Sequence, residues 1–180
     1  MKRTRNALIG FFAAAAAAAL ALSILPSQAA LAMDASMASP SEASFIMLVS
    51  AEQSLVDLTN ADRAANGLDP VQWDADTLPI ARQRAEEQLG SQSLNHYDSD
   101  GQLVFAELLG QAKLGYELAG ENLARASTSD ANITYRVEQA LMQSPTHRKN
   151  ILEERFHRMS IGAATDTTTG QIAFAEVYRD

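Results

Sequence analysis

An apolar run near the N-terminus divides this chain into a leader and a part that folds. Residues 7–25 are almost entirely apolar and follow the cations Lys2, Arg3 and Arg5. Small residues over 30–32 then form a cleavage site of the A-x-A type. This order is typical of a secretory signal, so we predict a signal peptide over residues 1–32 and an exported chain. Because the run is near the lower length limit for a bilayer span, an uncleaved N-terminal membrane anchor is the alternative.

The exported part is strongly acidic. The whole chain has a formal net charge of −8, and residues 1–32 contain three cations and no acid, so about −11 remains after cleavage. A surface of this charge repels nucleic-acid phosphates and anionic lipid headgroups. We therefore expect no nucleic-acid partner, and contact with a membrane only through an uncleaved signal.

The chain contains no cysteine. Disulfides and thiolate metal sites are therefore excluded, and an exported domain of this kind depends on its hydrophobic core. The roughly 140 residues that follow the signal are enough for one such domain. The small, polar residues 33–44 predict a linker, and residues 45–180 then form the domain.

The spacing of apolar residues predicts helices first and strands last. Apolar positions recur at three- and four-residue steps in four segments, which predicts helices over about 45–66, 76–89, 103–113 and 131–143. Residues 158–166 and 171–179 alternate instead and are joined by Thr-Thr-Thr-Gly, which predicts an antiparallel hairpin. This order indicates an α+β domain whose helices flank a small antiparallel sheet.

The remaining segments have no clear period. Residues 115–127 contain two glycines and are interpreted as a connection. Residues 144–150 contain Pro145 and are interpreted as a turn that ends the preceding helix. We expect Trp73 in the core and His157 at the surface. Glu176 is expected to face solvent, with the edge of a cleft as the alternative.

Two histidines and a glutamate are the candidate chemical groups. His96 lies in the polar stretch NHYDSDG, His147 in SPTHRKN and Glu121 in AGENLA. Two imidazoles and a carboxylate from separate segments are a suitable set for a divalent metal such as zinc, or for general acid–base chemistry. No H-E-x-x-H motif places two ligands on one helix, so histidines bonded to nearby backbone are the alternative.

Six segments between about residues 48 and 178 resemble those of one known family, in the same order. They read LVDLTNADRAANGLDPVQWDADTLPIARQRAEEQ, NHYDSDG, GYELAGENLA, ALMQSPTHRKNIL, FHRMSIGAA and FAEVY. The second to fourth are similar to the patterns S-H-x-S-P-D-G, G-Y-x-x-x-G-E-N-I-A and W-M-x-S-P-x-H-R-x-N-I-L. On these segments the chain resembles the CAP superfamily, named for cysteine-rich secretory proteins, antigen 5 and pathogenesis-related proteins. It looks most like the bacterial, cysteine-free branch.

The resemblance implies an α-β-α sandwich with a shallow cleft, in which some members bind zinc or other divalent ions. His96, Glu121 and His147 match the cleft positions of the family, so we expect them to face one another as metal ligands. A second cleft glutamate of many eukaryotic members is missing, because Gln143 and Ser144 stand near its place. Three further polar residues are expected to support the cleft structurally: Asn122, Arg148 and Asn150.

The resemblance also implies a function of binding rather than catalysis. We expect a secreted module that binds a divalent metal, a small apolar ligand, or a cell-wall component or protein. The alternative is a metal-dependent hydrolase or peptidase, in which zinc activates water and Glu121 and His147 take part in catalysis. A surface-anchored structural protein without a working cleft is the third hypothesis.

Overall fold

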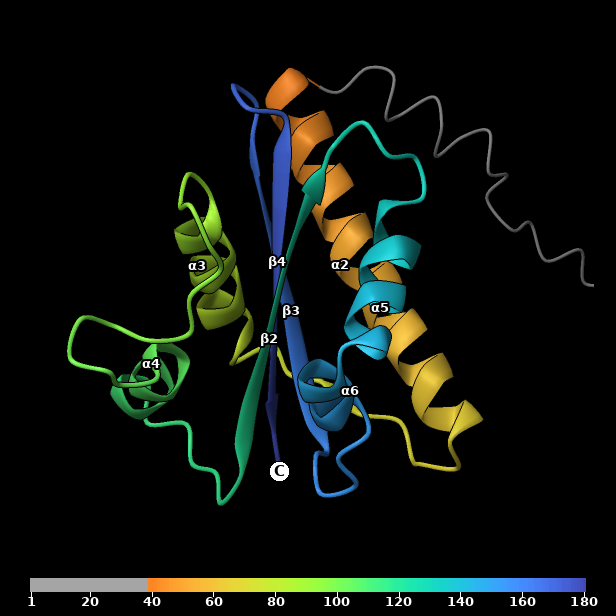
Figure 1. The fold of residues 1–180 in the computed structure, drawn as a ribbon, viewed down its shortest axis with the longest axis vertical. Coiled ribbons are helices and arrows are strands. Elements are labelled where there is room, and N and C mark those ends of the chain that lie inside the picture. The colour runs from red at the N-terminus through yellow and green to blue at the C-terminus, as the bar shows by residue number, and fades with distance from the viewer. Residues whose placement is uncertain (1–38) are drawn as a thin grey trace, which may run out of the picture. The chain divides into compact units, whose positions relative to one another are not determined.

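The computed structural model describes residues 39–180 (Figure 1). The predicted signal peptide at 1–32 and the first residues of the predicted linker lie outside this part. The described elements are α2 (Pro40–Ala65), β1 (Gln72–Trp73), α3 (Leu78–Gln88), α4 (Val104–Gln111), β2 (Ala119–Ser127), α5 (Ile133–Gln143), α6 (Pro145–Ile151), β3 (Arg158–Asp166) and β4 (Gln171–Arg179).

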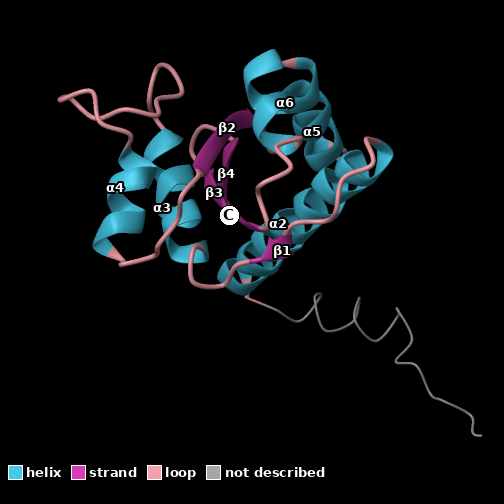
Figure 2. Ribbon diagram, turned by 90° about the horizontal axis from the view of Figure 1, so that it is seen from below, coloured by secondary structure: helices cyan, strands magenta, loops and turns pink. Residues whose placement is uncertain are grey.

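The elements form three layers, as the sequence predicts. Helices α3 and α4 lie on one side of the sheet, and α2, α5 and α6 lie on the other (Figures 1 and 2). The predicted α-β-α sandwich is therefore confirmed. None of the helices within residues 39–180 combines the length and apolar character needed to cross a bilayer.

Helix α2 begins earlier than its apolar spacing predicts. Ser39 is its N-cap: the hydroxyl of Ser39 accepts from the backbone N–H of Glu42, and the carboxylate of Glu42 accepts from the backbone N–H of Ser39. This reciprocal capping box satisfies two backbone donors that the helix leaves free. The helix therefore starts at Pro40 rather than near residue 45, and the last residues of the predicted linker are helical.

The sheet has four strands in the order β1-β3-β4-β2. The predicted hairpin is confirmed, with Arg158 opposite Arg179 and Asp166 opposite Gln171. The interpretation of residues 115–127 as a connection is wrong for residues 119–127. These residues form β2, an edge strand antiparallel to β4. The two-residue β1 pairs in parallel with β3, so the sheet is mixed rather than purely antiparallel.

Three local predictions fail or need correction. Trp73 is 41% exposed, because it belongs to the short edge strand β1 rather than to the core. Glu176 is 1% exposed rather than facing solvent. Pro145 follows the end of α5 but also begins α6, so His147 is helical rather than in a turn. Proline suits the first turn of a helix because the missing N–H would have had no partner there.

The core lies on both faces of the sheet. Successive side chains of a strand point to opposite faces. On β4, Phe174 and Tyr178 pack toward α2 and α5, while Val177 packs toward α3 and α4. The same alternation on β2 places neighbouring side chains in opposite layers. Glu121 therefore contacts α3, and Asn122 contacts α6.

Candidate functional site

His96 lies in the loop between α3 and α4, which is ordered by one aspartate. The carboxylate oxygen Oδ1 of Asp98 accepts from the backbone N–H groups of Asp100 and Gln102, both at 2.8 Å. Gly101 has a φ of +79°, a conformation that glycine adopts without strain. The loop closes where the carbonyl of His96 accepts from the N–H of Val104 at 3.0 Å.

Glu121 of β2 faces the α3 side of the sheet and is fully enclosed. Its side chain has 0% exposure, and both carboxylate oxygens have partners. Nε of Arg84 donates to Oε1 at 2.7 Å, and Nη2 donates to Oε2 at 3.2 Å. Nδ1 of His96 is 2.7 Å from the same Oε2. Glu121 therefore links a buried guanidinium to the partly exposed imidazole of His96.

His147 lies on α6, on the other side of the sheet from Glu121. The ring is half-buried, and burial lowers the pKa of His147. An electrostatic contribution from His96 lowers the pKa of His147 further. The carbonyl of His147 contacts β2, the edge strand that also carries Glu121.

Two asparagines attach α6 to this edge. Nδ2 of Asn150 donates to the carbonyl of Glu121 at 3.2 Å and to Oδ1 of Asn122 at 2.9 Å. Nδ2 of Asn122 donates to the carbonyl of His147 at 3.2 Å. The side chain of Asn122 has 0% exposure, so these bonds lie at least partly within the interior. They hold the helix that carries His147 in register with the strand that carries Glu121.

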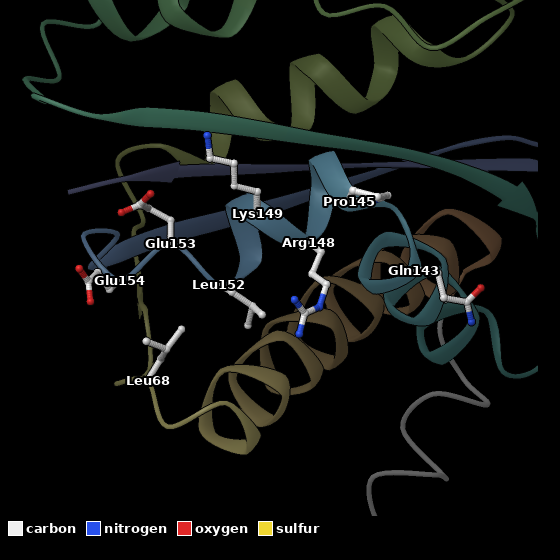
Figure 3. Close-up of a pocket in the computed structure, with 8 residues that line it drawn as sticks. All are labelled: Leu68, Gln143, Pro145, Arg148, Lys149, Leu152, Glu153 and Glu154. Carbon is white, nitrogen blue, oxygen red and sulfur yellow. The ribbon is translucent and has the colours of Figure 1, made fainter.

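Arg148 lies on another surface of α6. Its Nη2 donates to Oδ1 of Asn66, just beyond α2, at 3.3 Å. Arg148 lines a pocket of about 690 Å³. Figure 3 shows Arg148 there together with Lys149, Leu152 and Glu153. His96, Glu121 and His147 do not line this pocket. Its cations and acids balance one another, so its charge favours no particular ligand.

Of the three predicted metal ligands, Glu121 differs from the histidines because its side chain is already fully hydrogen-bonded. Within residues 39–180, no three His, Cys, Asp or Glu side chains are placed so that they could hold a metal ion together. Both oxygens of Glu121 are already bonded, whereas only Nδ1 of His96 is engaged. A carboxylate bonded to one imidazole nitrogen is the usual support for a histidine that binds metal through the other. Glu121 therefore supports the ring of His96 and has no carboxylate oxygen without a partner.

Arg84 is the site residue that sequence reasoning missed. Its side chain is 2% exposed and also donates to the carbonyl of Asn95 at 2.6 Å and to the carboxylate of Glu87. A signal was present, because Arg84 stands on the apolar side of α3 between Ala81 and Ala85. A cation in that position needs a buried acid, and Glu121 is that acid.

Comparisons with known proteins find relatives with the same fold. Residues 56–178 match the Cysteine-rich secretory protein family, abbreviated CAP. The uncharacterized protein YkwD of Bacillus subtilis (strain 168) is 30% identical over 111 residues, which cover 62% of this chain and 41% of YkwD. An extracellular protein containing an SCP domain, from Bacillus anthracis str. Ames, has a crystal structure with a TM-score of 0.62 and 27% identity, covering 79% of this chain and 44% of that chain.

A more distant structure shares the fold alone. A cysteine-rich secretory protein from Staphylococcus aureus subsp. aureus Mu50 has a TM-score of 0.54 and 19% identity, covering 72% of this chain and 38% of that one. This chain therefore spans less than half the length of all three relatives.

The family match contains the elements that build the site. It extends from α2 to β4 and includes His96, Glu121 and His147. It covers more than half of the chain, and the bacterial relatives share its layered architecture. The chain is a cysteine-free bacterial member of the cysteine-rich secretory protein (CAP) family.

Proposed function

We propose that this chain is an exported binding protein whose site at the edge of β2 takes a divalent metal ion through His96 and His147. The observation that carries the proposal is the 2.7 Å contact between Nδ1 of His96 and Oε2 of Glu121. This contact fixes the orientation of the ring and leaves Nε2 as the nitrogen available to a ligand. Zinc is the preferred ion, because imidazole is among its usual ligands.

Export is supported by two independent points. The N-terminal residues have the order of a secretory signal, and the relative from Bacillus anthracis is described as extracellular. A metal held by two imidazoles has coordination positions left for an oxygen or nitrogen of a cell-wall component or protein partner.

The position of Glu121 favours binding over hydrolysis. A general base needs an oxygen within reach of the water that it deprotonates. Both oxygens of Glu121 are bonded, and the side chain is enclosed. The proposed role of Glu121 is therefore to position His96, and no other acid was matched to the cleft.

Zinc is expected to raise the thermal stability of the purified chain. Free zinc at 100 times its dissociation constant would add about 2.7 kcal/mol, because it binds only the folded state. This corresponds to a rise of roughly 5–10 °C in Tm for a chain of this size. The rise should be lost in His96→Ala and in His147→Ala, and magnesium should have a smaller effect. Calorimetry or fluorescence-monitored melting measures it.

His157→Ala is the matched control. His157 is exposed and lies outside the site, so this variant should keep the full zinc response. A wild-type Tm that does not change with zinc would refute the metal site. A response retained in both the His96 and His147 variants would place the ion elsewhere.

A further inference from the structure

Two buried acids lie outside the candidate site, between the sheet and helices α2 and α5. Glu138 of α5 is 2% exposed, and Glu176 of β4 is 1% exposed. In each carboxyl group, Oε1 is buried and has no hydrogen-bond partner within the described residues. An ionised carboxylate in this position has lost water without a full replacement, so its charge is costly.

The other oxygen of each acid belongs to a set of hydrogen bonds that crosses this layer. The hydroxyl of Thr59, on α2, donates to Oε2 of Glu138 at 3.1 Å. Oε2 of Glu176 accepts from the hydroxyl of Tyr178 at 2.7 Å and from Nδ2 of Asn122 at 2.9 Å. The two acids therefore contact α2 and β2 as well as their own elements, α5 and β4.

Asn122 connects this layer to α6. The amide nitrogen that donates to Glu176 also donates to the carbonyl of His147. Oδ1 of the same side chain accepts from Asn150, which is also on α6. A change of charge or position at Glu176 therefore acts directly on the bonds that hold α6 against β2.

The groups facing the pair are acids, hydroxyls and an amide: Thr59 and Asp62 on α2, Tyr178 on β4 and Asn122 on β2. Burial, followed by the charge of Glu176, raises the pKa of Glu138 to about 9. Burial also raises the pKa of Glu176 to about 7, although its hydrogen bonds from Tyr178 and Asn122 act in the opposite direction. The ordinary value for both groups is 4.5.

We propose that Glu138 and Glu176 form a proton-dependent latch, which holds α5 and α6 on the sheet while protonated and loosens both helices when the two carboxyls ionise. The pair carries no charge at low pH and fits its apolar surroundings. Two neighbouring negative charges repel each other and need water. Opening of α5 supplies that water, because Glu138 already lines a pocket of about 320 Å³ between α2 and α5.

The direction of the pH dependence follows from proton linkage. Both pKa values are raised above 4.5, so the folded state binds protons more tightly than the unfolded state. The stabilisation is fully present below about pH 4.5 and is lost as the pH rises through about 7 and then about 9. Loosening is therefore expected between neutral and alkaline pH.

Amide hydrogen exchange of the full chain at pH 6 and pH 9 tests the latch. A chelator is present, so that no metal at the histidines contributes. Rates are corrected for the intrinsic effect of pH, and α4, on the opposite side of the sheet, is the internal reference. We expect protection of α5 and α6 to fall at least tenfold more than protection of α4. An equal change in all three helices would overturn the proposal.

Glutamine variants assign the effect to the two acids. In E138Q/E176Q the carboxyl charges are removed with little change in shape, so the additional loss of protection should disappear. The matched control E86Q replaces an exposed glutamate of α3 and should behave like the wild type. An additional loss that persists in the double variant contradicts the latch.

A direct titration keeps the proposal testable if the double variant does not fold. Carboxyl carbons of the glutamates in the wild-type chain are followed by nuclear magnetic resonance across the same pH range. Two of them should titrate well above the exposed glutamates, and these should be Glu138 and Glu176. Titration of every glutamate together in the ordinary range would overturn the proposal.

Discussion

Replacing Arg84 with methionine is expected to lower the free energy of unfolding by about 3–5 kcal/mol. Methionine occupies a similar volume but leaves the enclosed carboxylate of Glu121 without its cation. The carbonyl of Asn95, which accepts from Nη2 of Arg84 at 2.6 Å, loses that donor as well. An unpaired buried charge accounts for most of the cost. Urea denaturation at neutral pH, followed by circular dichroism, measures the change.

A double variant separates the unpaired charge from the loss of packing. Arg84→Met combined with Glu121→Met removes both charges, so the pair should be more stable than Arg84→Met alone. Arg136→Met is the matched control, because Arg136 is 72% exposed and its partner Asp130 is on the surface. That variant should change stability by less than about 1 kcal/mol. Similar losses of unfolding free energy in the Arg84 and Arg136 variants would show that burial of the Arg84–Glu121 pair does not cause the destabilisation.

The regular elements could be predicted because their apolar spacing is undisturbed. The four predicted helices correspond to α2, α3, α4 and α5, and the alternating tail corresponds to β3 and β4. These segments bury one face each, so periodicity reports directly on packing. Errors are concentrated at ends, where a cap such as Ser39 decides the boundary rather than the apolar pattern.

Strand β2 was missed because its sequence is unlike a typical strand. It contains a glycine, Glu121 and Asn122 within nine residues, and the side chains of Glu121 and Asn122 are buried against other elements. Neither the charge nor the alternation of apolar residues reveals such a strand. Pairing with all nine residues of β4 determines its conformation, and that information is not local.

Glu176 could have been placed from the sequence. Alternation along 171–179 puts it on the same face as Phe174 and Tyr178, which are both buried. The prediction of solvent exposure is wrong, and burial of Glu176 opposes its charge by raising the pKa of this group. An acid on the apolar face of a strand therefore predicts a buried polar group rather than a surface residue.

The candidate site could be predicted in composition but not in arrangement. His96, Glu121 and His147 were identified by motif, and the structure brings His96 and Glu121 into contact. The role of Glu121 depends on Arg84, which lies 37 residues away in sequence. No pattern along the chain shows that the guanidinium of Arg84 bonds this carboxylate, so the contact between Arg84 and Glu121 could be found only from the structure.

Gly162→Ala is expected to destabilise the fold by about 3 kcal/mol or more, at the upper end of the usual cost of overpacking. Gly162 lies on β3, where α3 crosses the sheet. A Cβ atom there would be 2.2 Å from the backbone carbon of Ala81 and from the backbone nitrogen of Arg82. Helix α3 would have to move away from the sheet, which would also strain the contact between Arg84 and Glu121. Equilibrium denaturation measures the loss.

The matched control is Gly110→Ala on α4, where an added Cβ meets nothing within 4 Å. Alanine is favoured over glycine in a helix, so this control should be stabilised by about 0.5–1 kcal/mol. Equal stability of the two variants would show that the close crossing of α3 and β3 does not require glycine.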